Sequence, residues 1–221
     1  MQTVSRTKIV DITCSSKYEK LLFRCLAPMP FRKHRNRQEY LARAIQKGFH
    51  KKILIFNDSV VGSIEYAPAE AAGYPIKGKN LIVMNCIWVL RKAKGHNFGK
   101  LLVQNMIENE TNASGFATIA LDNHPSPWFR KQQIERLGFK PKSSIEVINK
   151  RKHADHVFTV YLMWMSRSQL AEPPTWDEGK LLEGETFCIA HPLYHPLTWK
   201  GDLLERRQKR YSGAHANDKS L

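Results

Sequence analysis

The feature that most constrains how this chain can fold is residues 81–90, LIVMNCIWVL, an apolar run broken only by Asn85. Such a run predicts a strand that is buried on both faces of a sheet. A basic loop, RKAKGHNFG, follows it and leads directly into a helical pattern with one apolar side. That side is formed by Phe98, Leu101, Leu102 and Met106. A buried strand, a glycine-bearing loop and a helix in this order predict an α/β domain.

Apolar periodicity predicts the elements on both sides of this segment. Helices are expected over residues 18–26, 35–49 and 128–137, and Gly48 suits the end of the second helix. Strands are expected over residues 8–13, 53–56, 60–66, 117–121, 145–148 and 157–165. Asn57, Asp58 and Ser59 separate two β-branched runs and predict a hairpin turn. The fold class is therefore α/β, with a sheet covered by helices.

After about residue 165 the chain becomes rich in proline and aromatic residues without a regular apolar period. This pattern predicts a main domain at residues 1–165 and an extension at 166–221 that packs on it. Residues 205–210, ERRQKR, are expected to form a frayed helix, and the tail beyond them is expected to be partly disordered.

The charge of the chain points to an anionic ligand. Lys and Arg number 35 against 20 Asp and Glu, which gives a formal net charge of +15. Such a field attracts nucleic acid, and it equally attracts a small, highly phosphorylated molecule. Composition alone does not separate these two classes of ligand.

Location and redox state follow from segments that the sequence lacks. No apolar run reaches the roughly 18 residues that a membrane span needs, and the N-terminus has no apolar signal core. The four cysteines form no CxxC pair. We therefore expect a reduced, cytoplasmic protein with no membrane association.

The loop between the buried strand and the helix is the segment best suited to bind phosphate. The first N–H groups of a helix have no intrahelical partner, and the helix dipole places positive charge at that end. Gly95 and Gly99 let the backbone approach an anion closely, because a Cβ atom would intrude there. Neither a Walker loop nor a GxGxxG dinucleotide motif is present.

This loop resembles the R/Q-x-x-G-x-G/A signature of the GNAT acetyltransferase superfamily. Lys94, Asn97 and Gly99 occupy its Arg/Gln, first-Gly and second-Gly positions. Asn97 departs from the pattern, but asparagine tolerates the left-handed backbone that the turn needs. SVVGSIEY at 59–66 is similar to the family's third strand, and IERLGF at 134–139 is similar to its YEKLGF ending of helix four. The resemblance covers residues 8–165.

The resemblance implies a mixed central sheet flanked by helices, with the fourth and fifth strands splayed around acetyl-CoA as cosubstrate. Backbone amides at 95–100 would hold the pyrophosphate, and the fourth strand would pair with the pantetheine arm. No metal is implied. The implied cofactor-binding residues are Ile87, Trp88, Val89, Lys94, Gly95, His96, Asn97, Phe98, Gly99, Lys100 and Asn123.

The implied activity is transfer of an acetyl group to a primary amine by direct attack in a ternary complex. Glu65 is the candidate general base, although a strand carboxylate is also often solvated or ion-paired. Ile134 stands where the family has a tyrosine that protonates the leaving thiolate. Either another donor takes its place, with Tyr66 proposed and Tyr74 and Tyr161 as alternatives, or the thiolate leaves unassisted. Asn123 fits either a functional position or the turn that ends a strand.

Other interpretations stay open at this point. The scaffold could be catalytically impaired and serve as a basic nucleic-acid-binding or assembly protein, although no RRM, KH or helix-turn-helix signature is present. The acceptor is expected to be a small-molecule or peptide amine, and homodimer formation is compatible with the sequence. His191 and His195 have HxxxH spacing, but Pro192 excludes the helix that would bring both imidazoles to one metal ion. Cys86 in the apolar strand is interpreted as a packing residue.

Overall fold

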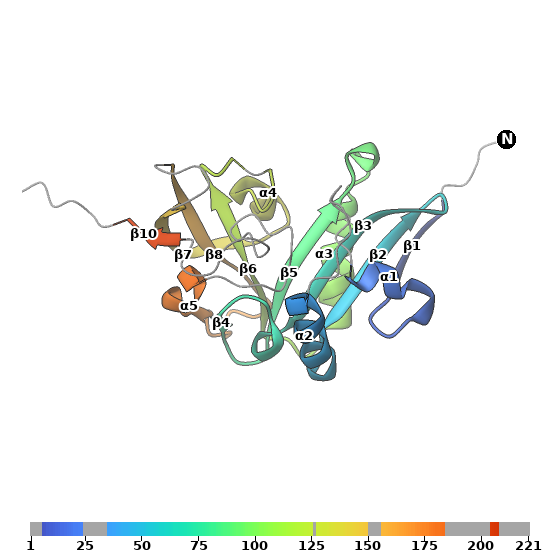
Figure 1. Cartoon of the computed structure of the whole chain (residues 1–221), viewed down its shortest axis with the longest axis horizontal. Coiled ribbons are helices and arrows are strands. Elements are labelled where there is room, and N and C mark those ends of the chain that lie inside the picture. Colours follow the sequence, from blue (N-terminus) through green and yellow to red (C-terminus); the bar gives the residue numbers. More distant parts are fainter. Residues whose placement is uncertain (1–5, 24–34, 126, 150–155, 184–203, 208–221) are drawn as a thin grey trace, which may run out of the picture.

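An eight-stranded mixed sheet forms the centre of the computed structural model, which describes residues 6–23, 35–125, 127–149, 156–183 and 204–207 (Figure 1). Its order is β1-β2-β3-β5-β6-β8-β7-β10. The strands are β1 Thr7–Asp11, β2 His50–Phe56, β3 Ser59–Pro68, β5 Leu81–Val89, β6 Gly115–Asp122, β7 Lys140–Asn149, β8 Val157–Ser166 and β10 Leu204–Arg206. The α/β fold class predicted from the sequence is confirmed.

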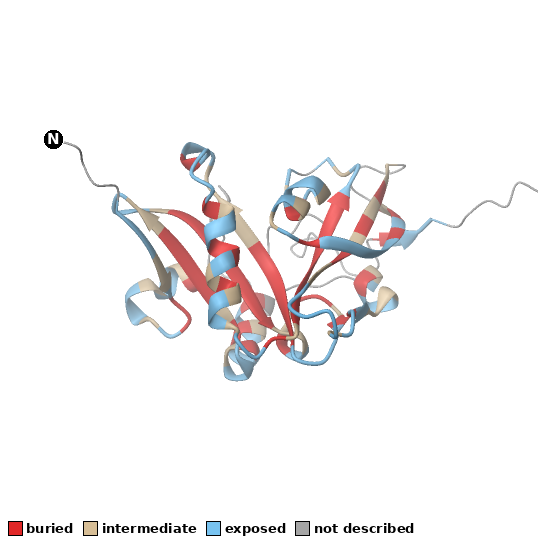
Figure 2. Ribbon diagram, turned by 180° about the vertical axis from the view of Figure 1, so that it is seen from behind, coloured by how far each residue is buried: buried red, intermediate tan, exposed pale blue. Residues whose placement is uncertain are grey.

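Helices cover both faces of this sheet. They are α1 Glu19–Phe23, α2 Arg35–Ala44, α3 Phe98–Asn109, α4 Lys131–Arg136 and α5 Glu178–Glu183. In Figure 1 α1 and α2 lie in front of the sheet, and Figure 2, seen from behind, shows α3 crossing the opposite face. A Cβ atom at Gly99 would lie 3.4 Å from Cδ2 of Leu137, so the start of α3 lies beside the end of α4.

The sheet divides between β5 and β6, its only parallel pair of strands among the described residues. Only three residue pairs join them, from Leu81↔Gly115 to Val83↔Ala117, whereas β3 stays paired with β5 as far as Val89. Beyond Val83 the two halves of the sheet diverge, as Figure 1 shows. The predicted splay of the fourth and fifth strands of the main sheet is therefore confirmed.

A β-bulge at Asn85 accompanies this divergence. Glu65 pairs with Cys86 and Tyr66 with Met84, so Asn85 is the extra residue on β5. Such an extra residue bends a strand and increases its twist. The Asn85 side chain is fully buried, accepts a hydrogen bond from Gly73 N (2.9 Å) and donates one to the Tyr40 hydroxyl (2.6 Å). The backbone carbonyl oxygen of Asn85 accepts a hydrogen bond from the Tyr74 hydroxyl (3.0 Å).

Replacing Asn85 by alanine should lower the free energy of unfolding by about 2–3 kcal/mol. The change removes the acceptor of a buried backbone N–H and the donor to the partly buried Tyr40 hydroxyl, and an unsatisfied buried polar group costs roughly 1–3 kcal/mol. Urea unfolding of the two proteins measures the difference. A loss below about 0.5 kcal/mol would show that the bulge does not depend on these bonds.

The core and most element boundaries agree with the apolar pattern. Residues 81–86 are buried, as predicted for a strand covered on both faces. The second predicted helix is shorter than expected: α2 ends at Ala44, a 3₁₀ turn spans Ile45–Lys47, and Gly48 (φ +88°) follows. Phe49 nevertheless packs against α2, because it is 1% exposed in a cluster with Leu41 and Ala44. The described helix α4 covers only the second half of the predicted 128–137 segment.

The end of the described chain adds to the sheet instead of forming the predicted frayed helix. Residues 204–206 are strand β10, antiparallel to β7 with Leu204 opposite Asn149, and Leu204 is buried. Backbone pairing with an edge strand explains why the helical prediction was wrong. Leu181 of α5 also joins the main core, and β9 Thr175–Trp176 pairs with β4 Ile76–Lys77. The tail from 208 lies outside the described residues, and the domain boundary near 165 stays a prediction.

Helices long and apolar enough to cross a membrane are not found in the part of the chain that the structure describes.

Candidate functional site

A loop with two unusual backbone conformations connects β5 to α3. A 3₁₀ turn at Arg91–Ala93 follows β5, Gly95 has φ +90° and Asn97 has φ 55°, in the left-handed region. The left-handed conformation expected for Asn97 is confirmed. A Cβ atom built on Gly95 would meet nothing within 4 Å, so the space beside this loop is not filled by protein atoms.

The peptide nitrogens of this loop are available for a ligand. The first hydrogen bond into α3 runs from Leu101 N to Asn97 O (3.1 Å), and Lys94 N bonds to Arg91 O (3.2 Å). Between these two bonds, the first turn of α3 presents N–H groups that have no intrahelical partner. Together with the helix dipole, they favour a negative charge in front of the loop.

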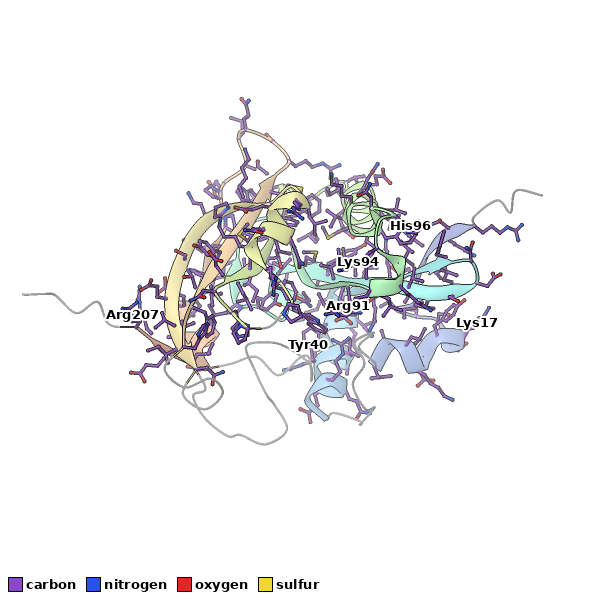
Figure 3. All side chains as sticks on the ribbon, turned by 90° about the horizontal axis from the view of Figure 1, so that it is seen from above. Lys17, Tyr40, Arg91, Lys94, His96 and Arg207 are labelled. Carbon is purple, nitrogen blue, oxygen red and sulfur yellow. The ribbon has the colours of Figure 1, made fainter. Side chains whose placement is uncertain are left out.

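Four cations surround the loop, and none of the ion pairs among the described residues involves them. They are Arg91, Lys92, Lys94 and Lys100. All four are exposed, and Figure 3 labels Arg91 and Lys94 with His96 along the loop. His96 is held by stacking: its ring lies 5.0 Å from that of Phe98 and 4.9 Å from that of Phe56. The loop therefore combines free amides with an excess of positive charge that its own side chains do not neutralise.

The end of β5 lies beside the divergence of the sheet. Ile87, Trp88 and Val89 pair with β3, but their register has no partner on β6. All three are half-buried, in contrast to the buried residues that precede them on the strand. The indole of Trp88 contacts that of Trp128, which lies between β6 and α4, with ring centroids 4.7 Å apart.

Glu65 does not have the environment of a general base. It is 6% exposed, and its Oε1 lies 2.7 Å from Arg37 Nη2 and 2.8 Å from Lys51 Nζ. Burial alone would raise the pKa of the Glu65 carboxyl, but the charges and hydrogen bonds of the two cations outweigh it and hold that pKa at about 2. A carboxylate with so low a pKa is a poor proton acceptor. Glu65 is therefore an ion-paired strand carboxylate, and we withdraw its assignment as general base.

Tyr66 lies on the face of the sheet that α3 covers. It is fully buried, its ring stacks on that of His50 at 5.2 Å, and Lys52 lies over it. Lys52 also donates a hydrogen bond to Asn105 of α3, which places this group beside the last turns of that helix, away from the glycine loop. Burial, reinforced by the Glu110 and Asp11 carboxylates, raises the pKa of Tyr66 above its ordinary value. We therefore withdraw the catalytic assignment of Tyr66.

The two alternative proton donors differ in their surroundings. Tyr74 is 2% exposed and donates to Asn85 O, and the amine of Lys131 lies 5.3 Å from the Tyr161 ring centroid. Ile134, at the position of the family's tyrosine, is 2% exposed in the core. Cys86 is buried in the strand, as expected for a packing residue.

Asn123 has a structural hydrogen bond and lines a cavity. Its side-chain Nδ2 donates to Val157 O (2.9 Å), and its φ of 54° matches the turn that ends β6. The cavity, of about 320 Å³, is also lined by Asp122, His124, Arg130, Lys131 and His156. The His156 Nε2–H donates to Asn123 O, which leaves Nδ1 as the nitrogen that can accept a proton. The cavity thus brings imidazoles to the carboxyl end of β6.

Sequence reasoning missed three residues that shape this region. Arg37 and Lys51 reach Glu65 from α2 and β2, and such long-range pairing leaves no periodic signal. Trp128 lies at the start of the helix predicted over residues 128–137, and only the structure places it against Trp88. Groups of three or more residues suited to hold a metal ion are not found among the described residues, and His191 and His195 lie outside them.

Solved structures share this fold at low sequence identity. A GNAT-family acetyltransferase from Desulfovibrio desulfuricans is 13% identical and covers 74% of this chain over 100% of its own length, with a TM-score of 0.51. The ribosomal-protein-S18-alanine N-acetyltransferase of Escherichia coli is 12% identical, with 76% and 97% covered and a TM-score of 0.50. An acetyltransferase of Bacillus subtilis in complex with CoA is 14% identical, with 74% and 100% covered and a TM-score of 0.50.

No protein-family model and no curated protein sequence matches the chain. The likeness to solved structures therefore concerns the fold: the chain has the GNAT fold, as the resemblance of its loop to the family signature implied.

Proposed function

We propose that this protein is an acyl-CoA-dependent N-acyltransferase that transfers the acetyl group of acetyl-CoA to a primary amine. The observation that carries the proposal is the loop at 94–100, where free amides, left-handed Asn97 and unpaired cations stand next to a sheet that opens between β5 and β6. The fold shared with acetyltransferases supports it, and one of those structures was solved with CoA.

The residues at the loop suit the phosphates of CoA. The amides of Gly95–Lys100 would hold the pyrophosphate, and Arg91, Lys92 and Lys94 are exposed beside them to balance its charge. The open space at Gly95 fits this assignment, because no side chain has to move before an anion can approach. The unpaired edge of β5 at Ile87–Val89 would hydrogen-bond the pantetheine arm as an added strand would.

The thioester of acetyl-CoA supplies an electrophilic carbonyl. The protein has to accept a proton from the attacking amine. Because the carboxylate of Glu65 is ion-paired with Arg37 and Lys51, the imidazoles of the cavity at the end of β6 are the candidates for this step. His124 and His156 line that cavity, and a neutral imidazole has one ring nitrogen that can accept a proton. The amine would attack the thioester directly while both substrates are bound, and the thiolate would leave with a proton from solvent.

Acetyl-CoA should raise the melting temperature of the protein by roughly 5–10 °C at a concentration near 100 times its Kd. Binding at that excess contributes about 2.7 kcal/mol, and about 1 kcal/mol shifts a chain of this size by roughly 2–4 °C. Differential scanning fluorimetry measures the shift. Pantetheine, which lacks the nucleotide phosphates, should give a much smaller shift.

A pair of lysine variants localises this binding. Lys94→Ala should reduce the shift, whereas Lys47→Ala, at an exposed position outside the loop, should leave it unchanged. A folded protein whose melting temperature does not respond to acetyl-CoA would refute the proposed function. Binding to nucleic acid that weakens steeply with salt, in the absence of any acetyl-CoA response, would instead favour the alternative of a basic binding protein.

A further inference from the structure

Two tryptophans meet where the sheet has opened. Val83↔Ala117 is the last pair between β5 and β6, and Trp88 lies beyond it near the end of β5. On its other side Trp88 still pairs with Ser63 of β3. Trp128 comes from the segment that follows β6, so its contact with Trp88 joins the two diverging halves of the sheet.

The Trp88 side chain lies on the face of the sheet opposite α3. Cross-strand partners share a face, so Trp88 lies on the face of Ser63, and Cys86 on that of Glu65. Glu65 contacts Arg37 of α2, whereas the α3 face carries Lys52, which bonds Asn105. If a ligand placed its phosphates at the start of α3 and its pantetheine arm between β5 and β6, Trp88 would lie on the side of that arm that faces away from α3.

The indole N–H of Trp88 is unsatisfied. Its Nε1 atom is buried and has no hydrogen-bond partner among the described residues. A buried donor without an acceptor is costly, and native structures rarely keep one without a role for it. The donor is neutral, and Glu65, which lies on the same face of the neighbouring strand β3, has its Oε1 bound by Arg37 and Lys51. It is therefore suited to a carbonyl oxygen that arrives with a ligand.

The geometry points to Trp88 as the hydrogen-bond donor to the carbonyl oxygen of the acyl thioester, with Trp128 covering it in the free protein. This inference rests on the proposed function, and it assigns a side-chain donor to the reacting carbonyl. The donor would strengthen its bond as negative charge develops on that oxygen. We expect binding of the acyl group to separate the two rings, because the carbonyl oxygen would have to approach the indole that now contacts Trp128.

The first test compares acetyl-CoA with CoA, which lacks the thioester carbonyl. Trp88→Phe keeps an aromatic ring but removes the N–H. We expect it to raise the Kd of acetyl-CoA about three- to tenfold, the effect of one buried hydrogen bond, and to change the Kd of CoA less than about twofold. Isothermal titration calorimetry measures both constants. An equal rise in the Kd of both ligands would show that the Trp88 N–H bonds an amide of the pantetheine arm. An unchanged Kd for acetyl-CoA would show that the Trp88 N–H does not bond the thioester carbonyl. Either result overturns the inference.

The second test follows the two rings by circular dichroism. Two indoles 4.7 Å apart at 45° give a coupled far-ultraviolet signal, and its loss in Trp128→Phe assigns that signal among the five tryptophans of the chain. We expect saturating acetyl-CoA to abolish the coupled signal in the wild-type protein. A signal that persists in the acetyl-CoA complex would overturn the covering role of Trp128. If the wild type binds neither ligand, the proposed function fails as well, and this outcome is distinct from binding with unchanged spectra.

Discussion

Replacing Glu65 by glutamine is expected to lower the free energy of unfolding by about 3–5 kcal/mol, the cost of removing one partner from a buried ion pair. Arg37 and Lys51 are 6% and 1% exposed, and both contact the same carboxylate oxygen of Glu65. Glutamine retains the shape and one acceptor oxygen but leaves two cations without this negative charge in a dry site. Arg37 also donates to Leu22 O (3.2 Å), so the change should loosen the connection of α1 to the sheet.

Urea unfolding with a matched variant measures this effect. Glu135→Gln breaks the partly exposed ion pair with Lys131 on α4, and such a pair contributes far less than a buried one. A loss at Glu65 no larger than the loss at Glu135 would show that the buried cluster is not held by this charge.

The stability that Glu65 contributes should also depend on pH. Its folded-state pKa of about 2 lies below the ordinary value of 4.5, so the unfolded chain binds the proton more readily. The contribution is therefore fully present above about pH 4.5 and is lost as the pH falls toward 2. The difference in unfolding free energy between the wild type and Glu65→Gln should shrink across that window. A difference that stays constant from pH 6 to pH 2.5 would contradict the ion-pair assignment.

Replacing Gly95 by valine should raise the Kd of acetyl-CoA more than a hundredfold. A β-branched residue at φ +90° is strained, so the loop must rebuild and its amides move away from the phosphates. The loss of two charge-assisted hydrogen bonds, at roughly 1.5–3 kcal/mol each, is sufficient for this effect. Calorimetric titration with acetyl-CoA measures the two constants.

Gly48→Val is the matched control for backbone strain. Gly48 has nearly the same dihedral, φ +88°, at the end of the 3₁₀ turn after α2, and a Cβ atom there would approach Pro68 at 3.3 Å. The control should lose stability and keep its affinity for acetyl-CoA. If both variants bind acetyl-CoA as tightly as the wild type does, the loop does not hold the phosphates.

Local patterns in the sequence predicted most of the fold because the apolar residues follow the period of each element. The run at 81–90 predicted a buried strand, and β5 spans Leu81–Val89 with residues 81–86 buried. The loop after it required a left-handed residue, and Asn97 adopts that conformation. The strand at 204–206 escaped prediction because its charged residues, Glu205 and Arg206, give no apolar alternation, and only its pairing with β7 makes it a strand.

Side-chain roles could not be predicted in the same way. The strand pattern placed Glu65 on a sheet but could not show that Arg37 and Lys51 converge on it from other elements. Tyr66 follows Glu65 along β3, and this alternation of faces puts its hydroxyl beside α3 rather than in the gap. The environments of both residues depend on contacts between elements far apart in sequence, which no local motif records.

The short β5–β6 ladder makes the sheet a pair of panels joined along one margin. The ladder across that joint is confined to residues 81–83 and 115–117. Beside it, Ser114 N donates to Asn80 O (2.8 Å) and the Thr118 hydroxyl donates to Met84 O (2.8 Å). Bending about this margin would widen or narrow the gap without disturbing the longer ladders on either side. A change confined to a few rungs would therefore alter the fit of a ligand between the panels while leaving each panel intact.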